Sequence, residues 1–289
     1  MRYERKCIRL WIEGNKVKKI LKYHCDETMA KILANMKQKV TVVNNLDDEH
    51  LTHLIRYGNT QSFDNADITY NWSSAILNAA DKIDARRTMR DAGVKIPKTV
   101  LPDDVLAFSD RLSLCGKWIA RPEEHFGGSN FEVVKNSPAM AREFLNNGWY
   151  LSRIFKKERE LRIHCAHGRV LLIHDKGIDG RTLNSNTHTT ADWTVLEWDD
   201  YPLLACQEAL KACDALGLDW GGVDVLTRGD DCVVLEVNTA PSVPGKIGPI
   251  KYARYFDWLL SSNTRRKHFN WTTIKNGYDM PWNSEELRS

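Results

Sequence analysis

Apolar and polar residues alternate in two short runs, 222–227 and 232–238, and this period of two predicts a pair of neighbouring β-strands. Turn-forming residues separate the runs, and we expect a three-residue loop over 229–231. With that loop, Asp224 lies directly opposite Glu236. A slip of one residue would turn one of the two carboxylates to the other face of the sheet, so the turn length decides whether the pair forms.

Side chains alternate between the two faces of a strand, so Asn238 is expected beside Asp224 and Glu236, with valines and leucines on the opposite face. Two close carboxylates repel each other and are costly to remove from water unless a cation neutralises them. A partial shell of oxygen ligands suits a hard cation such as Mg²⁺, completed by water and nucleotide phosphates. The alternative is an edge hairpin with solvated acids. The clean apolar alternation favours the metal site.

The hairpin and its flanks resemble the ATP-grasp enzymes, which include D-alanine–D-alanine ligase, glutathione synthetase and the ribosomal-protein glutamate ligases. Leu-Gly-Leu at 216–218, Gly-Val-Asp at 222–224 and Leu-Glu-Val-Asn-Thr-Ala-Pro at 235–241 carry the resemblance, which covers roughly residues 71–258. It implies an α+β ATP-grasp fold, in which two α/β subdomains clasp ATP behind a small N-terminal α/β domain. In that family the matching Asp, Glu and Asn hold the magnesium ions that bridge the ATP phosphates.

The resemblance also implies basic residues at the phosphates. Lys82 matches a lysine that reaches an ATP phosphate, and Lys176 matches a basic residue that faces the γ-phosphate in the glutamate ligases. A solvated lysine is the alternative for both. Arg121 stands where relatives carry lysine before proline, so its forked contacts should differ. A Gly-Gly-Ser turn at 127–129, between two expected strands, would offer backbone N–H groups to phosphate oxygens.

Residues 150–162 would hold the rest of the nucleotide. In relatives, the matching strand leads into a hinge whose backbone groups bracket adenine. Glu160 matches a contact to the ribose hydroxyls, for which Glu158 competes, and Arg162 matches a contact to phosphate or to the reacting carbonyl. The nucleotide-binding residues so implied are Lys82, Arg121, Gly127, Gly128, Ser129, Arg153, Ile154, Phe155 and Glu160, with Arg162 and Lys176 as the catalytic pair.

Periodicity, caps and breakers predict the remaining elements. The expected helices span 26–36, 47–57, 73–91, 138–147, 202–216 and 252–260, and the expected strands span 39–43, 117–121, 131–134, 150–155 and 169–174. The expected units are an N-terminal α/β domain with a linker helix over 1–98, a small ATP-grasp subdomain over 99–155, a large subdomain with the metal site over 156–260 and a C-terminal extension over 261–289.

Composition narrows the class of protein. The chain has 289 residues, of which 42% are hydrophobic and 27% charged, as in ordinary globular proteins. No apolar run approaches the ~18–20 residues of a membrane span, and the N-terminus lacks the apolar core of a signal peptide. Seven scattered cysteines suit a reducing compartment, so we expect a cytoplasmic protein without a membrane partner. A net charge of +3 argues neither for nor against nucleic acid.

The resemblance to the ATP-grasp enzymes implies an ATP- and Mg²⁺-dependent carboxylate–amine ligase. A substrate carboxylate would attack the γ-phosphorus of ATP, and an amine would then attack the acyl phosphate with loss of phosphate. A phosphotransferase acting on a hydroxyl and a nucleotide-binding pseudoenzyme are the alternatives. The expected substrates are small-molecule or peptide carboxylates and amines. A nucleic-acid acceptor and a homodimer are left open.

Overall fold

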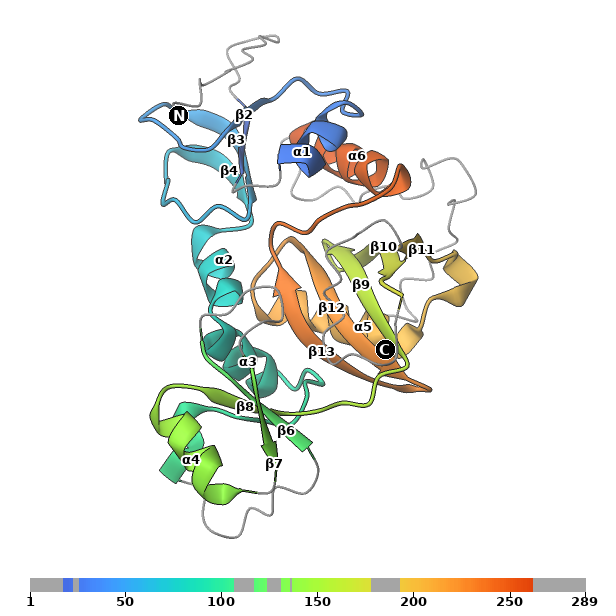
Figure 1. Cartoon of the computed structure of the whole chain (residues 1–289). Helices are drawn as coiled ribbons and strands as arrows, with labels where there is room; N and C mark the ends of the chain where they lie inside the picture. The colour runs from blue at the N-terminus through green and yellow to red at the C-terminus, as the bar shows by residue number, and fades with distance from the viewer. Residues whose placement is uncertain are drawn as a thin grey trace.

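The computed structural model describes residues 18–22, 26–106, 117–123, 131–135, 137–177 and 193–261. Over these ranges three β-sheets follow one another along the molecule, with helices against them (Figure 1). The strands are β1 (Lys18–Lys22), β2 (Thr41–Val43), β3 (Leu51–Tyr57), β4 (Ala66–Tyr70), β5 (Thr99–Val100), β6 (Lys117–Arg121), β7 (Glu132–Lys135), β8 (Tyr150–Arg153), β9 (Arg159–Ala166), β10 (Arg169–Asp175), β11 (Thr194–Val195), β12 (Trp220–Arg228) and β13 (Asp231–Asn238). The α-helices are α1 (Asp26–Leu33), α2 (Ser73–Ala80), α3 (Lys82–Asp91), α4 (Pro138–Asn146), α5 (Leu203–Ala215) and α6 (Ile247–Ser261).

The N-terminal sheet is parallel and has the strand order β2-β1-β3-β4. The expected helix over 47–57 is wrong, because Leu51–Tyr57 forms β3 in the middle of this sheet. A central strand of a parallel sheet is buried on both faces, so it lacks the alternation that identifies a half-exposed strand, and this one buries even His53 and Arg56. Helices α1 and α6 pack against one face, where Ile20 and Ile55 meet Phe256.

The large sheet is antiparallel with the order β11-β10-β9-β12-β13. Helix α5, which lies within the helix expected over 202–216, covers the back of the hairpin, and α2 and α3 pack beside it (Figure 1). The covered face is apolar and includes Val223, Val225 and Val237. Alternation along the strands therefore leaves the polar residues of β9, β12 and β13 on the opposite face.

The single helix expected over 73–91 is in fact two helices, α2 and α3, that meet at Asp81. Asp81 has an extended backbone, and its carboxylate accepts hydrogen bonds from the N–H groups of Ile83 and Asp84. This is the geometry of an N-cap, which satisfies donors that the first helical turn leaves free. Lys82 is consequently the first residue of α3 and not a residue on the side of a long helix.

The small sheet has the order β5-β8-β6-β7 and packs on α4 through a core that contains Trp118, Leu145 and Leu151. Ser137 caps α4, because its side chain accepts from the N–H of Met140 and proline follows at the first helical turn. Within the described ranges, no helix is long and apolar enough to cross a membrane.

Candidate functional site

The β12–β13 hairpin brings the two predicted carboxylates together by a route that differs from the expected one. The expected three-residue loop is wrong: Arg228 pairs with Asp231, and the register then shifts by one residue before Asp224 pairs with Glu236. Leu235 is the extra residue of this β-bulge. A shorter turn and a bulge have compensating effects on the register, so the expected pairing of Asp224 with Glu236 is confirmed.

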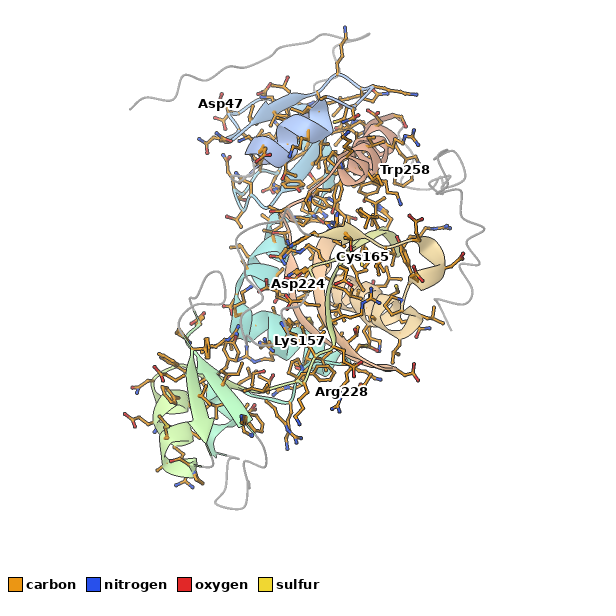
Figure 2. The ribbon with its side chains drawn as sticks, turned by 45° about the vertical axis from the view of Figure 1, so that its right-hand side comes forward. Asp47, Lys157, Cys165, Asp224, Arg228 and Trp258 are labelled. Atoms are coloured by element: carbon orange, nitrogen blue, oxygen red, sulfur yellow. The ribbon has the colours of Figure 1, made fainter. Side chains whose placement is uncertain are left out.

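The strand register places four side chains in one row across the polar face of the large sheet. His174 pairs with Arg162, Arg162 pairs with Asp224, and Asp224 pairs with Glu236. Residues two positions along each strand share the same face, which adds Asn238 to the site. The row thus crosses β10, β9, β12 and β13, and its charged members lie near the centre of the molecule, where Asp224 is labelled in Figure 2.

Asp224 is buried and accepts hydrogen bonds from two cations. Arg162 donates from Nε to Oδ1 at 2.7 Å and from a terminal nitrogen to Oδ2 at 2.8 Å, and Lys176 Nζ donates to Oδ2 at 2.7 Å. Burial raises the pKa of the Asp224 carboxyl, but Arg162 and Lys176 outweigh burial and hold that pKa well below its ordinary value. The carboxylate is therefore charged at any physiological pH.

Lys176 extends the network to Glu160 on β9. Its Nζ donates to Glu160 Oε1 at 3.0 Å, and Lys157 Nζ donates to Glu160 Oε2 at 2.7 Å. Burial raises the pKa of Glu160. The nearby lysines lower this pKa by a larger amount, so its net shift is downward. Cations and carboxylates alternate along this series of hydrogen-bonded side chains, which limits the free-energy cost of burying each charge.

Glu236 lies at the other end of the row and is neutralised from a different element. Lys82, at the start of α3, donates from Nζ to Glu236 Oε2 at 2.9 Å. The Asn238 amide nitrogen donates to Oε1 at 3.3 Å. Burial raises the pKa of Glu236, but the charge and hydrogen bond of Lys82, together with the charge of Arg162, outweigh burial, so the net shift of this pKa is also downward. The break at Asp81 matters here because it starts α3 at the residue that reaches this carboxylate.

The donor set fits Mg²⁺. Within the described ranges no group of three or more His, Cys, Asp and Glu side chains could hold a metal ion, so the candidate site is the mixed set of Asp224, Glu236 and Asn238. Two close carboxylates need positive charge nearby to neutralise them. The side chains of Arg162, Lys176 and Lys82 supply that charge here. Carboxylate oxygens accept more than one partner, so these groups can share their oxygens with a hard cation.

Aromatic and imidazole groups that the sequence analysis missed surround the cations. The Arg162 guanidinium lies 5.0 Å and Lys176 Nζ 5.3 Å from the ring centroid of Trp193. Behind them, His164 bonds to His174 at 3.1 Å and to the Tyr252 hydroxyl of α6 at 2.8 Å. His164 stands two residues after Arg162 on the same strand, and this spacing indicated that it shares a face of the sheet with Arg162. Nothing in the sequence around Trp193 indicates the role of that residue.

The segment after Asn238 folds back over the site and meets the N-terminal sheet. The Tyr57 hydroxyl donates to the carbonyl of Pro241 at 2.5 Å. Gly58 has a φ of 72°, and a Cβ added there would lie 2.6 Å from Cβ of Ala240. Only glycine allows both the backbone angle and this close approach. The C-terminal end of β3 is thereby fixed against the end of β13 that carries Asn238.

The predicted adenine hinge is partly occupied by sheet contacts. The N–H groups of Arg153 and Ile154 donate to the carbonyls of Lys98 and Lys117, each at 2.9 Å. Both donors are used within the protein, so a base would have to meet other backbone groups of this segment, such as those of Phe155.

Arg121, another predicted nucleotide residue, lies in the small sheet. The guanidinium of Arg121, at the end of β6, lies 5.8 Å from the ring centroid of Phe131. Gly127, Gly128 and Ser129 lie outside the described residues, as does the expected extension from residue 262 onward.

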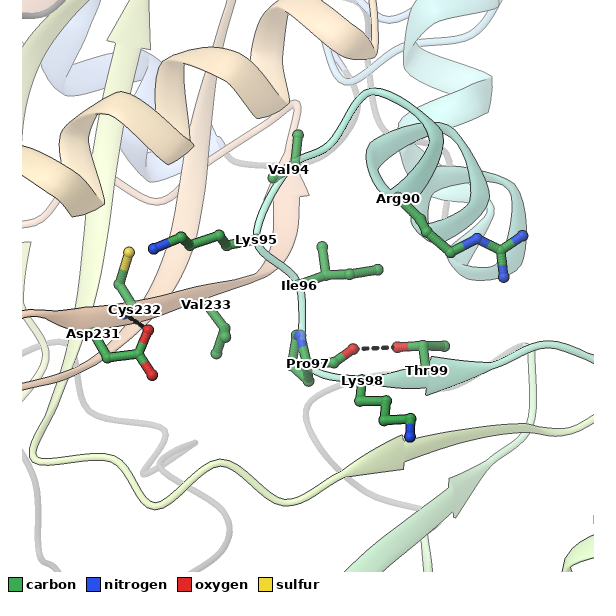
Figure 3. A pocket seen from close by; sticks show the side chains of 10 residues that line it. All are labelled: Arg90, Val94, Lys95, Ile96, Pro97, Lys98, Thr99, Asp231, Cys232 and Val233. Atoms are coloured by element: carbon green, nitrogen blue, oxygen red, sulfur yellow. Dashed lines mark hydrogen bonds between the residues drawn. The ribbon is translucent and has the colours of Figure 1, made fainter. Parts of the chain in front are cut away.

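A separate hollow of about 400 Å³ borders the first residues of β13 (Figure 3). The linker between α3 and β5 forms its other wall, and Val234 N–H donates to Lys95 O across this edge at 2.7 Å. None of the charged residues of the row lines it. The hollow is therefore distinct from the carboxylate site.

No protein-family model matches the chain. Among curated proteins, a probable alpha-L-glutamate ligase of Desulfotalea psychrophila is 26% identical over 189 residues, which make up 61% of this chain and 39% of the relative. Another, from Xanthomonas oryzae pv. oryzae, is 27% identical over 189 residues, 62% of this chain and 63% of the relative. The chain spans less than two thirds of the length of these relatives.

Solved structures are similar over most of the chain. One is a RiPP-associated ATP-grasp ligase of Chryseobacterium gregarium in complex with ADP and a leader and core peptide. Its TM-score is 0.59 at 15% identity, and the superposition covers 87% of this chain and 99% of the ligase chain. D-alanine–D-alanine ligase of Bacillus anthracis has a TM-score of 0.57 at 13% identity, with 86% and 97% covered. The solved ligases share the fold of this chain, which therefore has the ATP-grasp fold.

Proposed function

We propose that this protein is an ATP- and Mg²⁺-dependent carboxylate–amine ligase that works through an acyl phosphate. The observation that carries the proposal is the row in which Arg162 and Lys176 hold Asp224 opposite Glu236 and Asn238. Such a set joins ligands for a hard cation to cations that can neutralise phosphate oxygens.

The carboxylates, the amide and the cations of the site have distinct roles in this reaction. Asp224, Glu236 and Asn238 would hold Mg²⁺, which when bound offsets the charge of the nucleotide's phosphates. Lys176 and Arg162 would then stabilise the charge that shifts onto the oxygen bridging the β- and γ-phosphorus as the substrate carboxylate attacks. Lys82 and Arg121 would orient the phosphates from the other side. The protein's work in such a transfer is positioning and charge neutralisation.

The substrate class is inferred from relatives. The curated relatives are named probable alpha-L-glutamate ligases, and several structural neighbours carry bound peptides, including a macrocyclase of Microcystis aeruginosa with its precursor peptide. We therefore propose a carboxylate of a peptide or small molecule as the acceptor, with an amine such as that of glutamate as the nucleophile. The cysteines of the described ranges are free, which supports a cytoplasmic setting. A homodimer is a further expectation that sedimentation would check.

A phosphate-release screen tests this function. Mg-ATP is incubated with pairs of carboxylates and amines, first glutamate with peptides that end in acidic residues. Release that requires both partners supports a ligase. ATP consumption with a hydroxyl compound alone, without free phosphate, would instead identify a phosphotransferase. Absence of ATP consumption together with nucleotide binding would identify a binding module. Glu236→Gln is the inactive control, because it removes a proposed metal ligand while keeping the shape of the side chain.

A further inference from the structure

Glu160 is directed into the protein and not toward an open nucleotide cleft. Its side chain is 7% exposed, and each carboxylate oxygen accepts from a different lysine, Lys176 at 3.0 Å and Lys157 at 2.7 Å. The sequence analysis expected this residue to bind ribose hydroxyls. Both of its oxygens are instead occupied by charged donors, whose hydrogen bonds are stronger than those of neutral hydroxyls.

Lys157 is anchored to the large sheet, although it lies in the segment that crosses from the small sheet. The next residue, Glu158, donates from its N–H to the carbonyl of Thr227 at 2.8 Å, and its Oε2 accepts from the N–H of Gly229 at 2.9 Å. These two hydrogen bonds attach the end of the connecting segment 154–158 to the β12–β13 hairpin. Figure 2 shows Lys157 between Asp224 and Arg228. The lysine is thus held in place on the Glu160 side of the site.

Lys176 has few alternatives to its observed position. Its side chain is 3% exposed and lies between the carboxylates of Glu160 and Asp224, with Trp193 over it. A buried ammonium must stay near a counter-ion, and two counter-ions on neighbouring strands define one position between them. If Glu160 lost its charge, Asp224 alone would hold Lys176, in competition with Arg162 for the same oxygens.

We propose that Glu160 is a positioning residue, which fixes Lys176 for contact with the terminal phosphate of the nucleotide while Lys157 neutralises its second oxygen. This inference rests on the proposed function, since it takes Lys176 to be the residue that meets that phosphate. It replaces the ribose contact expected from the family resemblance with a contact inside the protein. Glu160 then acts on the phosphate only through another side chain.

Calorimetric titration with AMP, ADP and AMP-PNP, each with Mg²⁺, separates the two roles without an acceptor. For Glu160→Gln we expect AMP-PNP affinity to fall roughly 10- to 100-fold, the usual effect of losing a hydrogen bond between charged groups. AMP affinity should change less than about twofold, because AMP has no terminal phosphate to meet Lys176. Equal losses for AMP, ADP and AMP-PNP would overturn the proposal in favour of a ribose contact. Titration with 2′-deoxyATP checks that result, because a ribose contact predicts discrimination in the wild type that Glu160→Gln abolishes.

Two further variants make the test specific. Lys176→Met should lower AMP-PNP affinity, and adding Glu160→Gln to it should cause no further loss, because residues that act as a unit are not additive. Additive losses would contradict the inference. Glu143→Gln is the matched control, because it makes the same substitution at an exposed acid of α4, and the expected change is below about twofold. Melting temperatures identify any variant that fails to fold. A wild-type chain that binds no nucleotide would overturn the proposed function as well, whereas equal losses overturn this inference alone.

Discussion

The polar face of the large sheet has two ends that bury polar groups in different ways. Beneath α6, the side chains of His164, His174 and Tyr252 form a chain of hydrogen bonds. At the other end, Asp224 is buried among cations. Neutral groups whose hydrogen bonds are already made to one another gain nothing by exchanging partners. A cluster of charged groups can instead replace its internal partners with phosphates and a metal ion. The first end supports the fold, and the second is suited to bind a charged ligand.

The largest effect on stability is expected at the charged end. Asp224→Asn keeps the shape of the side chain but leaves Arg162 and Lys176 without their shared counter-ion. Removing one partner of a buried ion pair typically lowers the free energy of unfolding by ~3–5 kcal/mol. Denaturant unfolding measures this, with Asp214→Asn on the exposed side of α5 as control. A loss no larger than that of the control would show that the charged end contributes nothing to stability.

The histidine end should make the protein sensitive to mild acid. Burial, reinforced by the charge of Arg162, lowers the pKa of His174 to about 4, from an ordinary value of 6.5. Burial, with the neighbouring His174 and Arg162, also lowers the pKa of His164. Between pH 6.5 and 4 the unfolded chain binds protons that the folded chain excludes, so stability falls as the pH falls. For His174 alone the loss is about 3 kcal/mol.

Urea unfolding at a series of pH values checks this expectation, with His174→Gln as the comparison. The variant should show a shallower decline over the same window. Asp224 acts in a lower window: its depressed pKa gives stability that is present above ~4 and is lost only as the pH falls through its folded pKa. Stability that stays level down to pH 4 in the wild type would mean that the two ends do not differ in the proposed way.

The smallest effect on stability is expected for Glu236→Gln. The side chain of Glu236 is 33% exposed against 6% for Asp224, and its ion pair with Lys82 is open to solvent. Partly exposed pairs contribute little, so the melting temperature should change by less than about 2 °C. Turnover should be abolished, since a proposed metal ligand is lost. Parallel melting and phosphate-release assays decide the matter, and a large drop in melting temperature would assign Glu236 a structural role.

The sequence analysis predicted the site where local patterns determine it. Period-two alternation correctly predicted the two strands that carry Asp224 and Glu236, and helical periodicity correctly predicted the helix over 202–216, because each depends on residues close in sequence. The turn length was wrong because the bulge at Leu235 depends on distant residues. Arg86 donates to the carbonyl of Leu235 at 3.3 Å, and the carbonyl of Lys95 accepts from the N–H of Val234, the residue before Leu235, at 2.7 Å.

Other elements were missed for related reasons. Leu51–Tyr57 was predicted as a helix because a strand buried on both faces has no alternation to display. Trp193 reaches Arg162 only through the fold, so no sequence pattern identifies it. Lys157, by contrast, stands three residues before Glu160, and weighing that short spacing would have shown the acid to be a partner of lysine.

The bulge at Leu235 also has an evolutionary consequence. Because one surplus residue in β13 offsets a short connection at Gly229, a deletion in the strand could be compensated by an insertion in the connection, and the two carboxylates would still face each other. Homologous chains can therefore differ in the length of this connection and share the same chemistry. A sequence alignment that matches the connection residue by residue would misalign Asp224 and Glu236 with their counterparts. An alignment anchored on these carboxylates would not.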